Sequence, residues 1–302
     1  MDRHMRFWEM LRHRAAMVLV GLAVLAGPAY ARPPVWVVKD HDSRIVLFGS
    51  IHVLPPMSDG KAPDWLPPSL ARDLAAAQDV WFELPIDPNT AAQVSQLALA
   101  RGLLPKGQTL SSRLSILGRD RLARLAARTG FRADQLERLQ PWLAEATISV
   151  AVFQHEGASG KEGVEQILSA RLGQEVVRNA FETPQAQIGF LASASPSEQL
   201  ASLEETLRQF DEDPLAYKKL VTAWMFGDLA ALDREAIEPV RTLTPGLYQV
   251  LIRQRNERWV NRLRQRLFGK GTTVIIVGVG HLIGQDGLPA MLRAQGIEVE
   301  GP

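Results

Sequence analysis

The chain of 302 residues contains no cysteine and carries almost no excess of charge, with 34 basic against 33 acidic side chains. The lack of cysteine excludes disulfide bonds, thiolate metal ligands and a cysteine nucleophile. The balanced charge lacks the basic face that nucleic-acid-binding proteins need. The zinc-protease pattern His-Glu-x-x-His and the serine-hydrolase pattern Gly-x-Ser-x-Gly are also missing. Carboxylates, arginines and the six histidines are therefore the first candidates for chemistry.

Residues 1–31 have the pattern of a secretory signal peptide. Arginines precede an apolar run at 15–29, which is shorter than the roughly 20 residues of a spanning helix, and Ala29-Tyr30-Ala31 is a small-x-small cleavage site. We expect cleavage after Ala31 and a domain over residues 32–302 with no stable membrane span. Export without cysteine fits a bacterial periplasm. The alternative is that the apolar run stays uncleaved as an N-terminal anchor.

Strand patterns lie near both ends and in the middle of the chain. Runs rich in β-branched and aromatic residues occur at 35–52, 79–85, 175–184, 272–281 and 296–301. Helical spacing of apolar residues fills about 88–172 and 184–268. The pattern predicts an α/β fold, in which a central mixed sheet of N-terminal, middle and C-terminal strands carries a large helical insertion or cap.

Four of these strands end in residues that can bind a metal ion: His52, Glu83, Glu182 and His281. If the strands are parallel, their carboxyl ends meet at one edge of the sheet, where α/β proteins bind ligands. Two imidazoles and two carboxylates suit a divalent ion such as Mn, Co, Zn or Fe. Each histidine has a structural alternative as a core or capping residue, and each glutamate as a surface charge or a helix-start residue.

Arg255 is the candidate for binding an anion. It lies on the apolar stripe of a helix, four residues after Leu251 and four before Trp259. A guanidinium on a buried face needs a carboxylate or an anionic substrate group. The alternative is a structural ion pair within the protein.

The segments LFGSIHVLPP, FELP, PWLAEA, FETPQAQ, AWMFGD, RNERW and VGVGHLIGQDGLPAMLRAQGIEVE resemble the TraB/GumN family in their order along about residues 35–300. That family includes the animal TIKI proteins, which are metal-dependent proteases. The resemblance implies an α/β core like that of erythromycin esterase-like proteins and of the haem-binding protein ChaN.

The resemblance also implies roles for single residues. His52 and His281 match the family's two histidines, which are proposed metal ligands or catalytic residues. Glu83 and Glu182 match its acidic positions. Arg255 and Asn256 match its Arg-Asn pair on a long helix. Where the family usually has Gly-x-Asp this chain has Gly163-Val164-Glu165, and the extra methylene changes the reach of that carboxylate.

These observations predict a metal-dependent hydrolase with a peptide or small-molecule substrate. His52, His281, Glu83 and Glu182 are the expected metal ligands, and Glu83, Glu182, Arg255 and Asn256 the expected catalytic residues. The hydrolase and the protease are implied by the family, whereas the residues themselves indicate a polar site at the strand ends. Two alternatives stay open: a periplasmic protein that binds haem or a metal without catalysis, and an interaction protein of an export or polysaccharide system with a degenerate site.

Overall fold

The computed structural model describes residues 32–56 and 64–302, and the strands within them form one six-stranded sheet. The strands are β1 (Val35–Lys39), β2 (Ser43–Ser50), β3 (Ala77–Phe82), β4 (Val177–Ala180), β5 (Gly271–Gly278) and β6 (Val299–Glu300). Their order across the sheet is β4-β3-β5-β2-β1-β6. The expected signal peptide lies outside the described residues, and Arg32–Pro302 form one compact unit.

The sheet is mixed, and its parallel part brings the expected site residues to one edge. β4, β3, β5 and β2 are parallel neighbours, whereas β1 pairs antiparallel with both β2 and β6. β1 and β2 form an antiparallel hairpin at the start of the domain, within the strand-like run predicted at 35–52. The predicted α/β fold with a central mixed sheet is therefore confirmed.

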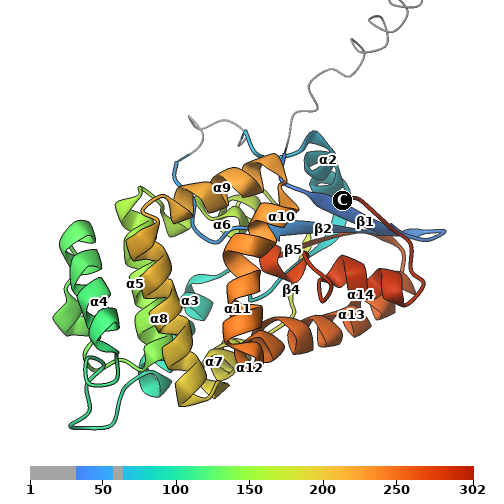
Figure 1. Ribbon diagram of the computed structural model, residues 1–302. Helices are drawn as coiled ribbons and strands as arrows, with labels where there is room; N and C mark the ends of the chain where they lie inside the picture. Colours follow the sequence, from blue (N-terminus) through green and yellow to red (C-terminus); the bar gives the residue numbers. More distant parts are fainter. Residues whose placement is uncertain (1–31, 57–63) are drawn as a thin grey trace, which may run out of the picture. The chain divides into compact units, whose positions relative to one another are not determined.

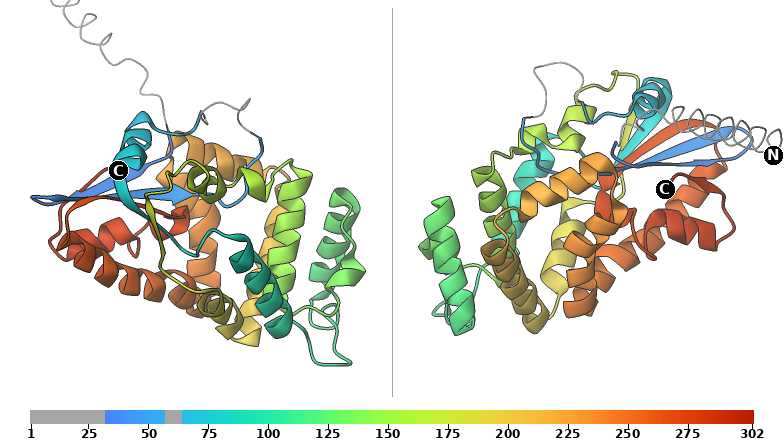
Figure 2. Two further views of the ribbon diagram at one scale, coloured as in Figure 1. Left: turned by 180° about the vertical axis from the view of Figure 1, so that it is seen from behind. Right: turned by 45° about the horizontal axis from the view of Figure 1, so that its top comes forward.

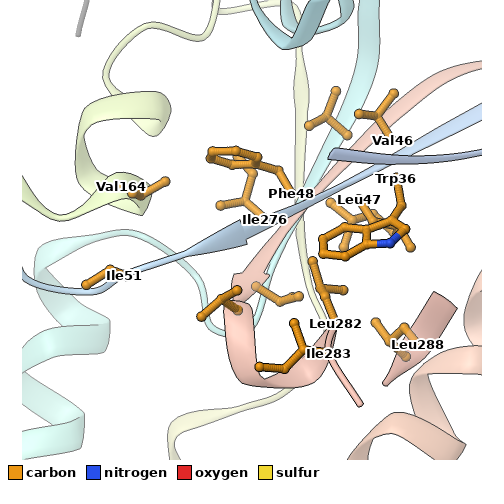
Figure 3. Close-up of a cluster of buried hydrophobic side chains, with 14 of the residues drawn as sticks. Trp36, Val46, Leu47, Phe48, Ile51, Val164, Ile276, Leu282, Ile283 and Leu288 are labelled. Carbon is orange, nitrogen blue, oxygen red and sulfur yellow. The ribbon is translucent and has the colours of Figure 1, made fainter. Parts of the chain in front are cut away.

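The parallel strands are apolar because both faces of the sheet are covered. Val274, Ile275, Ile276 and Val277 of β5 are all fully buried. Figure 3 shows β2 and β5 side chains packed with residues from the segment after β5. Helix α2 (Pro68–Ala76) lies on one side of the sheet and helices α13 (Gln254–Leu267) and α14 (Leu288–Ala294) lie on the other (Figure 1). Because helices cover both faces of the sheet, the strand ends at its edge are where a site can form.

Helices fill the two long stretches between the strands, as the sequence predicted. They are α3 (Pro88–Arg101), α4 (Ile116–Thr129), α5 (Pro141–His155), α6 (Val164–Ser169), α7 (Pro184–Ser193), α8 (Pro196–Glu212), α9 (Ala216–Phe226), α10 (Leu229–Leu232), α11 (Glu238–Leu243) and α12 (Pro245–Tyr248). Short 3-10 turns are Ala133–Leu136, Gly160–Glu162 and Val279–His281, and π-helical turns are Asp233–Ile237 and Gln249–Arg253. Several helices open on a proline after a capping side chain, as at Asp87 and Ser195.

A second apolar cluster holds the helical part together. It is formed mainly by α4, α5 and α8, with Leu125, Leu203 and Leu207 fully buried. This part lies beyond the carboxyl ends of the parallel strands (Figure 2). Within residues 32–56 and 64–302, no helix is both long and apolar enough to span a membrane. Because the helical part lies beyond the carboxyl ends of the parallel strands, the site at those ends lies where the helical part meets the sheet.

Candidate functional site

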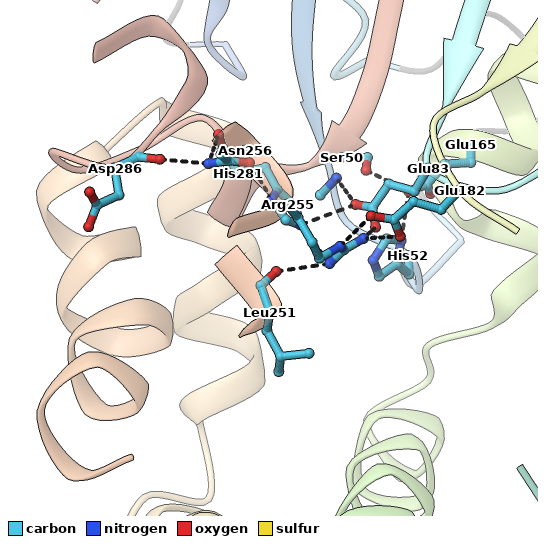
Figure 4. Close-up of polar contacts among 11 residues, drawn as sticks. Ser50, His52, Glu83, Glu165, Glu182, Leu251, Arg255, Asn256, His281 and Asp286 are labelled. Carbon is cyan, nitrogen blue, oxygen red and sulfur yellow. Dashed lines mark hydrogen bonds and ion pairs between the residues drawn. The ribbon is translucent and has the colours of Figure 1, made fainter. Parts of the chain in front are cut away.

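The strand register brings the four predicted side chains together. Ser50, two residues before His52, pairs with Gly278, three residues before His281. The pairing of β3 with β4 continues past the strands, because the Glu182 amide donates to the Glu83 carbonyl at 2.9 Å. Figure 4 shows the side chains of His52, Glu83, Glu182 and His281 around Arg255. The sequence-based prediction that these residues meet at one edge is borne out by the geometry.

Two glycines allow the segments around His52 to pack closely. A Cβ on Gly49 would lie 3.0 Å from the Cα of Val279, so β2 passes directly against the turn that carries His281. A Cβ on Gly163 would lie 2.1 Å from the carbonyl oxygen of His52. That contact leaves no room for a side chain, and it brings the Gly163-Val164-Glu165 segment against His52.

Arg255 lies at the centre of the site. It is the second residue of α13, and α13 directly follows the π-helical turn Gln249–Arg253. Such turns are frequent at functional sites. Its Nε donates to Glu182 at 2.7 Å, and its Nη2 donates to Glu83 at 2.6 Å and to Glu182 at 2.9 Å. Its Nη1 contacts the Leu251 carbonyl at 3.0 Å and Nε2 of His281 at 2.9 Å. All five N–H groups of the guanidinium are thus engaged within the protein.

Asn256 sets the orientation of the His281 ring. Its amide nitrogen donates to the carbonyls of His281 and Asp286, so its Oδ1 is left to accept from Nδ1–H of His281 at 2.7 Å. Nε2 of His281 is then the unprotonated nitrogen, and it accepts from Arg255. Burial, together with the charges of Arg255 and His52, lowers the pKa of His281 to about 3, although Glu83 opposes that shift. His281 is therefore neutral near pH 7.

His52 has the opposite character. Its Nδ1 lies 2.6 Å from Oε1 of Glu165, and the Ser50 hydroxyl donates to the same oxygen at 2.5 Å. The charge of Glu165, together with its hydrogen bond, raises the pKa of His52 to about 9. The His52 side chain is 66% exposed, whereas that of Glu165 is 12% exposed. His52 is therefore a cationic ring that is anchored at Nδ1 and accessible from solvent.

The two glutamates bound to Arg255 differ in their electrostatics. Burial alone would raise the pKa of Glu83, but His281, Arg255 and His52, together with the Gly278 amide bond, lower it to about 2. Burial raises the pKa of Glu182 despite its bonds to Arg255. Glu182 does not cap the following helix, because the Thr183 side chain accepts from the Ala186 amide at that helix start. The side chain that caps this helix is thus that of Thr183, whereas the Glu182 carboxylate pairs with Arg255.

A cavity of about 270 Å³ opens onto this cluster. Its polar wall includes His52, Glu83, Arg255 and His281, and its apolar wall includes Phe190 and Ile252. Oε1 of Glu83 and Nε2 of His52 both face Gly278, at 3.1 Å and 3.5 Å from the position of an added Cβ there. A carboxylate and an imidazolium thus face the same small space.

In this arrangement the four expected metal ligands contact other side chains: His281, Glu83 and Glu182 contact Arg255, and His52 contacts Glu165. Nε2 of His281 and Oε1 of Glu83 are 3.8 Å apart, a spacing that two ligands of one ion can have. However, a guanidinium N–H occupies the lone pair of His281, and both glutamates bind the same cation. Throughout the described parts of the chain, no three His, Asp or Glu side chains are grouped to hold an ion. An ion on His281 would require Arg255 to move.

The sequence analysis named six candidate site residues, four at strand ends and two on a helix, and all six lie at this edge: His52, Glu83, Glu182, Arg255, Asn256 and His281. It missed the partnership of Glu165 and Ser50 with His52. The only signal for Glu165 was the glutamate in place of the family's aspartate, and Ser50 had only its position two residues before His52 on the same strand. Neither signal indicates a contact with His52, and Glu165 is 113 positions away from His52 in the sequence.

Comparisons with known proteins agree with the resemblance seen in the motifs. The model of the TraB/PrgY/gumN family matches residues 34–301. Two relatives, both named "Uncharacterized protein YbaP", come from Escherichia coli (strain K12) and Shigella flexneri. Each is 27% identical over 272 residues, which cover 90% of this chain and 96% of the relative. No solved structure matches the chain.

Proposed function

The chain belongs to the TraB/PrgY/gumN family, and from the geometry of its site we propose that it is a hydrolase. The observation that carries the proposal is the pair of oppositely charged groups on one cavity. His52 is held as a cation by Glu165, and Glu83 is held as an anion by Arg255. An acid and a base that face the same space are what hydrolysis needs.

The proposed reaction uses these two groups to move protons. Glu83 takes a proton from a water molecule as it attacks the carbonyl carbon of the substrate. His52 donates its Nε2 proton to the leaving atom when the carbon–heteroatom bond breaks. A positioned general acid or base contributes about 10²–10⁴-fold to the rate, and most when its pKa lies near the operating pH. Because the pKa values of Glu83 and His52 lie well below and above neutrality, we expect the lower end of that range.

Arg255, Glu182, Asn256 and His281 act as positioning residues in this proposal. The guanidinium holds Glu83 at 2.6 Å, and Glu182 holds the guanidinium through two further bonds. Asn256 and His281 complete the frame on the other side. A base that is already oriented does not lose orientational freedom when the substrate binds.

The divalent ion expected from the sequence stays a prediction. His52, His281 and Glu83 supply the donor types for Zn or Mn, and the ion would activate a water molecule. Because Arg255 already binds His281 and Glu83, the arrangement seen here supports the acid–base route. Elemental analysis of gently purified protein distinguishes the two forms of the proposal.

The proposed substrate is a peptide or a small molecule, met in the periplasm after export. A cavity of about 270 Å³ accepts a side chain or a small acyl group. Phe190 and Ile252 on its wall favour an apolar group beside the scissile bond. Export and substrate class are both parts of the proposal.

The test is a panel of chromogenic esters and fluorogenic peptides, assayed with the chain from residue 32 onward. Variants His52→Gln and Glu83→Gln are compared with His41→Gln, which changes an exposed turn residue outside the site. The proposal expects turnover that falls at least about 100-fold in both site variants and is unchanged in the control. Turnover that survives His52→Gln, or no turnover of any substrate with or without added divalent ions, overturns it.

A further inference from the structure

A second cavity lies in the helical part of the chain, away from the strand ends. It has a volume of about 220 Å³, and α5, α8, α9 and α11 contribute to its wall. It lies between the two apolar clusters, since Phe153 packs against both of them. Phe153 stacks on Tyr217 with ring centroids 4.6 Å apart and meets the edge of Phe210 at 5.8 Å. These rings give the cavity an apolar wall.

Glu145 brings a carboxyl group into this cavity. Ser202 and Thr206 on α8 both donate to its Oε1, each at 2.8 Å. Neither bond engages Oε2, and among the described residues Glu145 has no basic partner. Burial raises the pKa of this carboxyl, while the two hydroxyl bonds oppose the shift. A nearby cation would reverse the effect of burial, because it favours the charged form.

The other acidic groups on this wall are already neutralised. Glu205 binds Arg208 through both oxygens, at 2.8 Å and 2.6 Å. Glu235 accepts from Arg234 at 2.9 Å. No Lys, Arg or His side chain lines the cavity within the described parts of the chain. Glu145 is therefore the acidic group on this wall without a counter-charge.

We propose that this cavity binds a small primary amine with an apolar body, whose ammonium group pairs with Oε2 of Glu145 while its carbon chain packs against Phe153, Phe210 and Tyr217. The volume equals the share of about seven water molecules in the liquid, so it holds an amine of about seven non-hydrogen atoms. Burying a carboxylate in its charged form is unfavourable unless a cation is paired with it. The cavity thus selects an amine over an alcohol or an acid of the same length.

Tyr217 connects this cavity to the segment that carries His52. Its ring lines the cavity, and its hydroxyl donates to the carbonyl of Val53 at 3.1 Å. Val53 directly follows His52. A ligand packed against Tyr217 therefore lies one hydrogen-bonded side chain away from the segment that holds His52, and the binding proposal does not depend on hydrolysis.

Calorimetric titration with hexylamine, hexanol and hexanoate tests the proposal on the chain from residue 32 onward. We expect hexylamine to bind most tightly, and Glu145→Gln to weaken it about tenfold or more while hexanol is unaffected. Glu205→Gln is the matched control, because its carboxylate lines the same cavity but is already paired, and it keeps the preference for the amine. Ser149→Phe fills the cavity from α5 and abolishes binding of all three ligands.

The proposal is overturned if none of the three ligands binds saturably to the parent protein. It is also overturned if Glu145→Gln retains the preference for hexylamine. Should Glu145→Gln fail to fold, Ser149→Phe decides, since unchanged hexylamine binding in that variant places the amine elsewhere. These outcomes are independent of any hydrolase assay.

Discussion

Nη1 of Arg255 lies 2.9 Å from Nε2 of His281, so a permanent cation contacts the one lone pair that the ring presents to the site. The lone pair cannot turn away, because Asn256 binds the other ring nitrogen. The histidine that the sequence suggested as a metal ligand thus serves, in this arrangement, as an acceptor for arginine. Arg255 therefore affects both the stability of the fold, through its buried ion pairs, and the availability of His281 to a metal ion. Both effects can be measured.

Replacing Arg255 by methionine should destabilise the protein strongly. Glu83 and Glu182 would lose their shared counter-charge while buried, and breaking such a pair costs about 3–5 kcal/mol. Urea unfolding of Arg255→Met and of Arg264→Met measures the effect, since Arg264 is exposed on the same helix. Equal midpoints for the two variants would show that the buried ion pairs contribute nothing.

The same variant should bind divalent ions more tightly than the parent does. Removal of the guanidinium frees Nε2 of His281 and both carboxylates for coordination. The melting temperature with added Mn²⁺ or Zn²⁺ should rise more in Arg255→Met than in the parent, and His281→Gln in the Arg255→Met background should cancel the rise. A parent protein that retains a stoichiometric ion through gel filtration would contradict the resting contact of Arg255 with His281.

The charge of Glu165 should be visible in the titration of His52. The pKa of His52 is raised to about 9, and its first cause is the neighbouring carboxylate. In Glu165→Gln that pKa should fall toward the ordinary value of about 6.5. Proton NMR of the imidazole C–H signals follows the change, with His52→Gln to assign the resonance. Glu165→Asp is the control that keeps the charge, and a His52 signal that titrates alike in parent and Glu165→Gln would refute the pairing.

Much of the fold could be read from the sequence because its signals are local. Runs of β-branched and aromatic residues indicate strands, and helical spacing of apolar residues indicates the helices between them. Arg255 stood on the apolar stripe of its helix, and that helix does bury it. Parallel neighbours then place four strand ends at one edge.

The contacts within the site could not be read in the same way. Whether Arg255 or a metal ion lies among Glu83, Glu182 and His281 depends on side-chain rotamers, and both choices satisfy the same residue types. The pairing of His52 with Glu165 depends on Gly163 fitting against the His52 carbonyl. That fit is a property of packed backbone rather than of any sequence pattern.

Export should leave a chain that begins at Arg32. The basic start, the short apolar run and Ala29-Tyr30-Ala31 together predict cleavage after Ala31. Intact-mass spectrometry of protein from the periplasmic fraction of a bacterial host measures the N-terminus. Ala31→Leu should slow processing, because a large residue replaces the small one before the cut. A mature mass that still includes Met1 and the apolar run would establish the anchored alternative instead.

Between pH 6.5 and 4.5, His281 should make folding depend on pH with a known sign. Its folded pKa is about 3, because burial disfavours the charged ring, whereas an unfolded histidine titrates near 6.5. As the pH falls through this window, the unfolded chain takes up a proton that the folded chain does not, so the free energy of unfolding decreases by up to about 1.4 kcal/mol per pH unit. Glu83, with a pKa lowered to about 2, adds a loss of the same sign only below about pH 4.5. The raised pKa values of Glu145 and Glu182 act with the opposite sign, so the contribution of His281 is measured as a difference between variants. Urea unfolding at several pH values should show the same slope in the parent and in His155→Gln, which changes an exposed helix-end histidine. The slope in His281→Gln should differ from theirs by up to about one proton, because that variant lacks the His281 contribution. Identical slopes in all three proteins would mean that His281 takes up its proton in the folded state, and the Asn256–His281–Arg255 chain of hydrogen bonds would then be wrong.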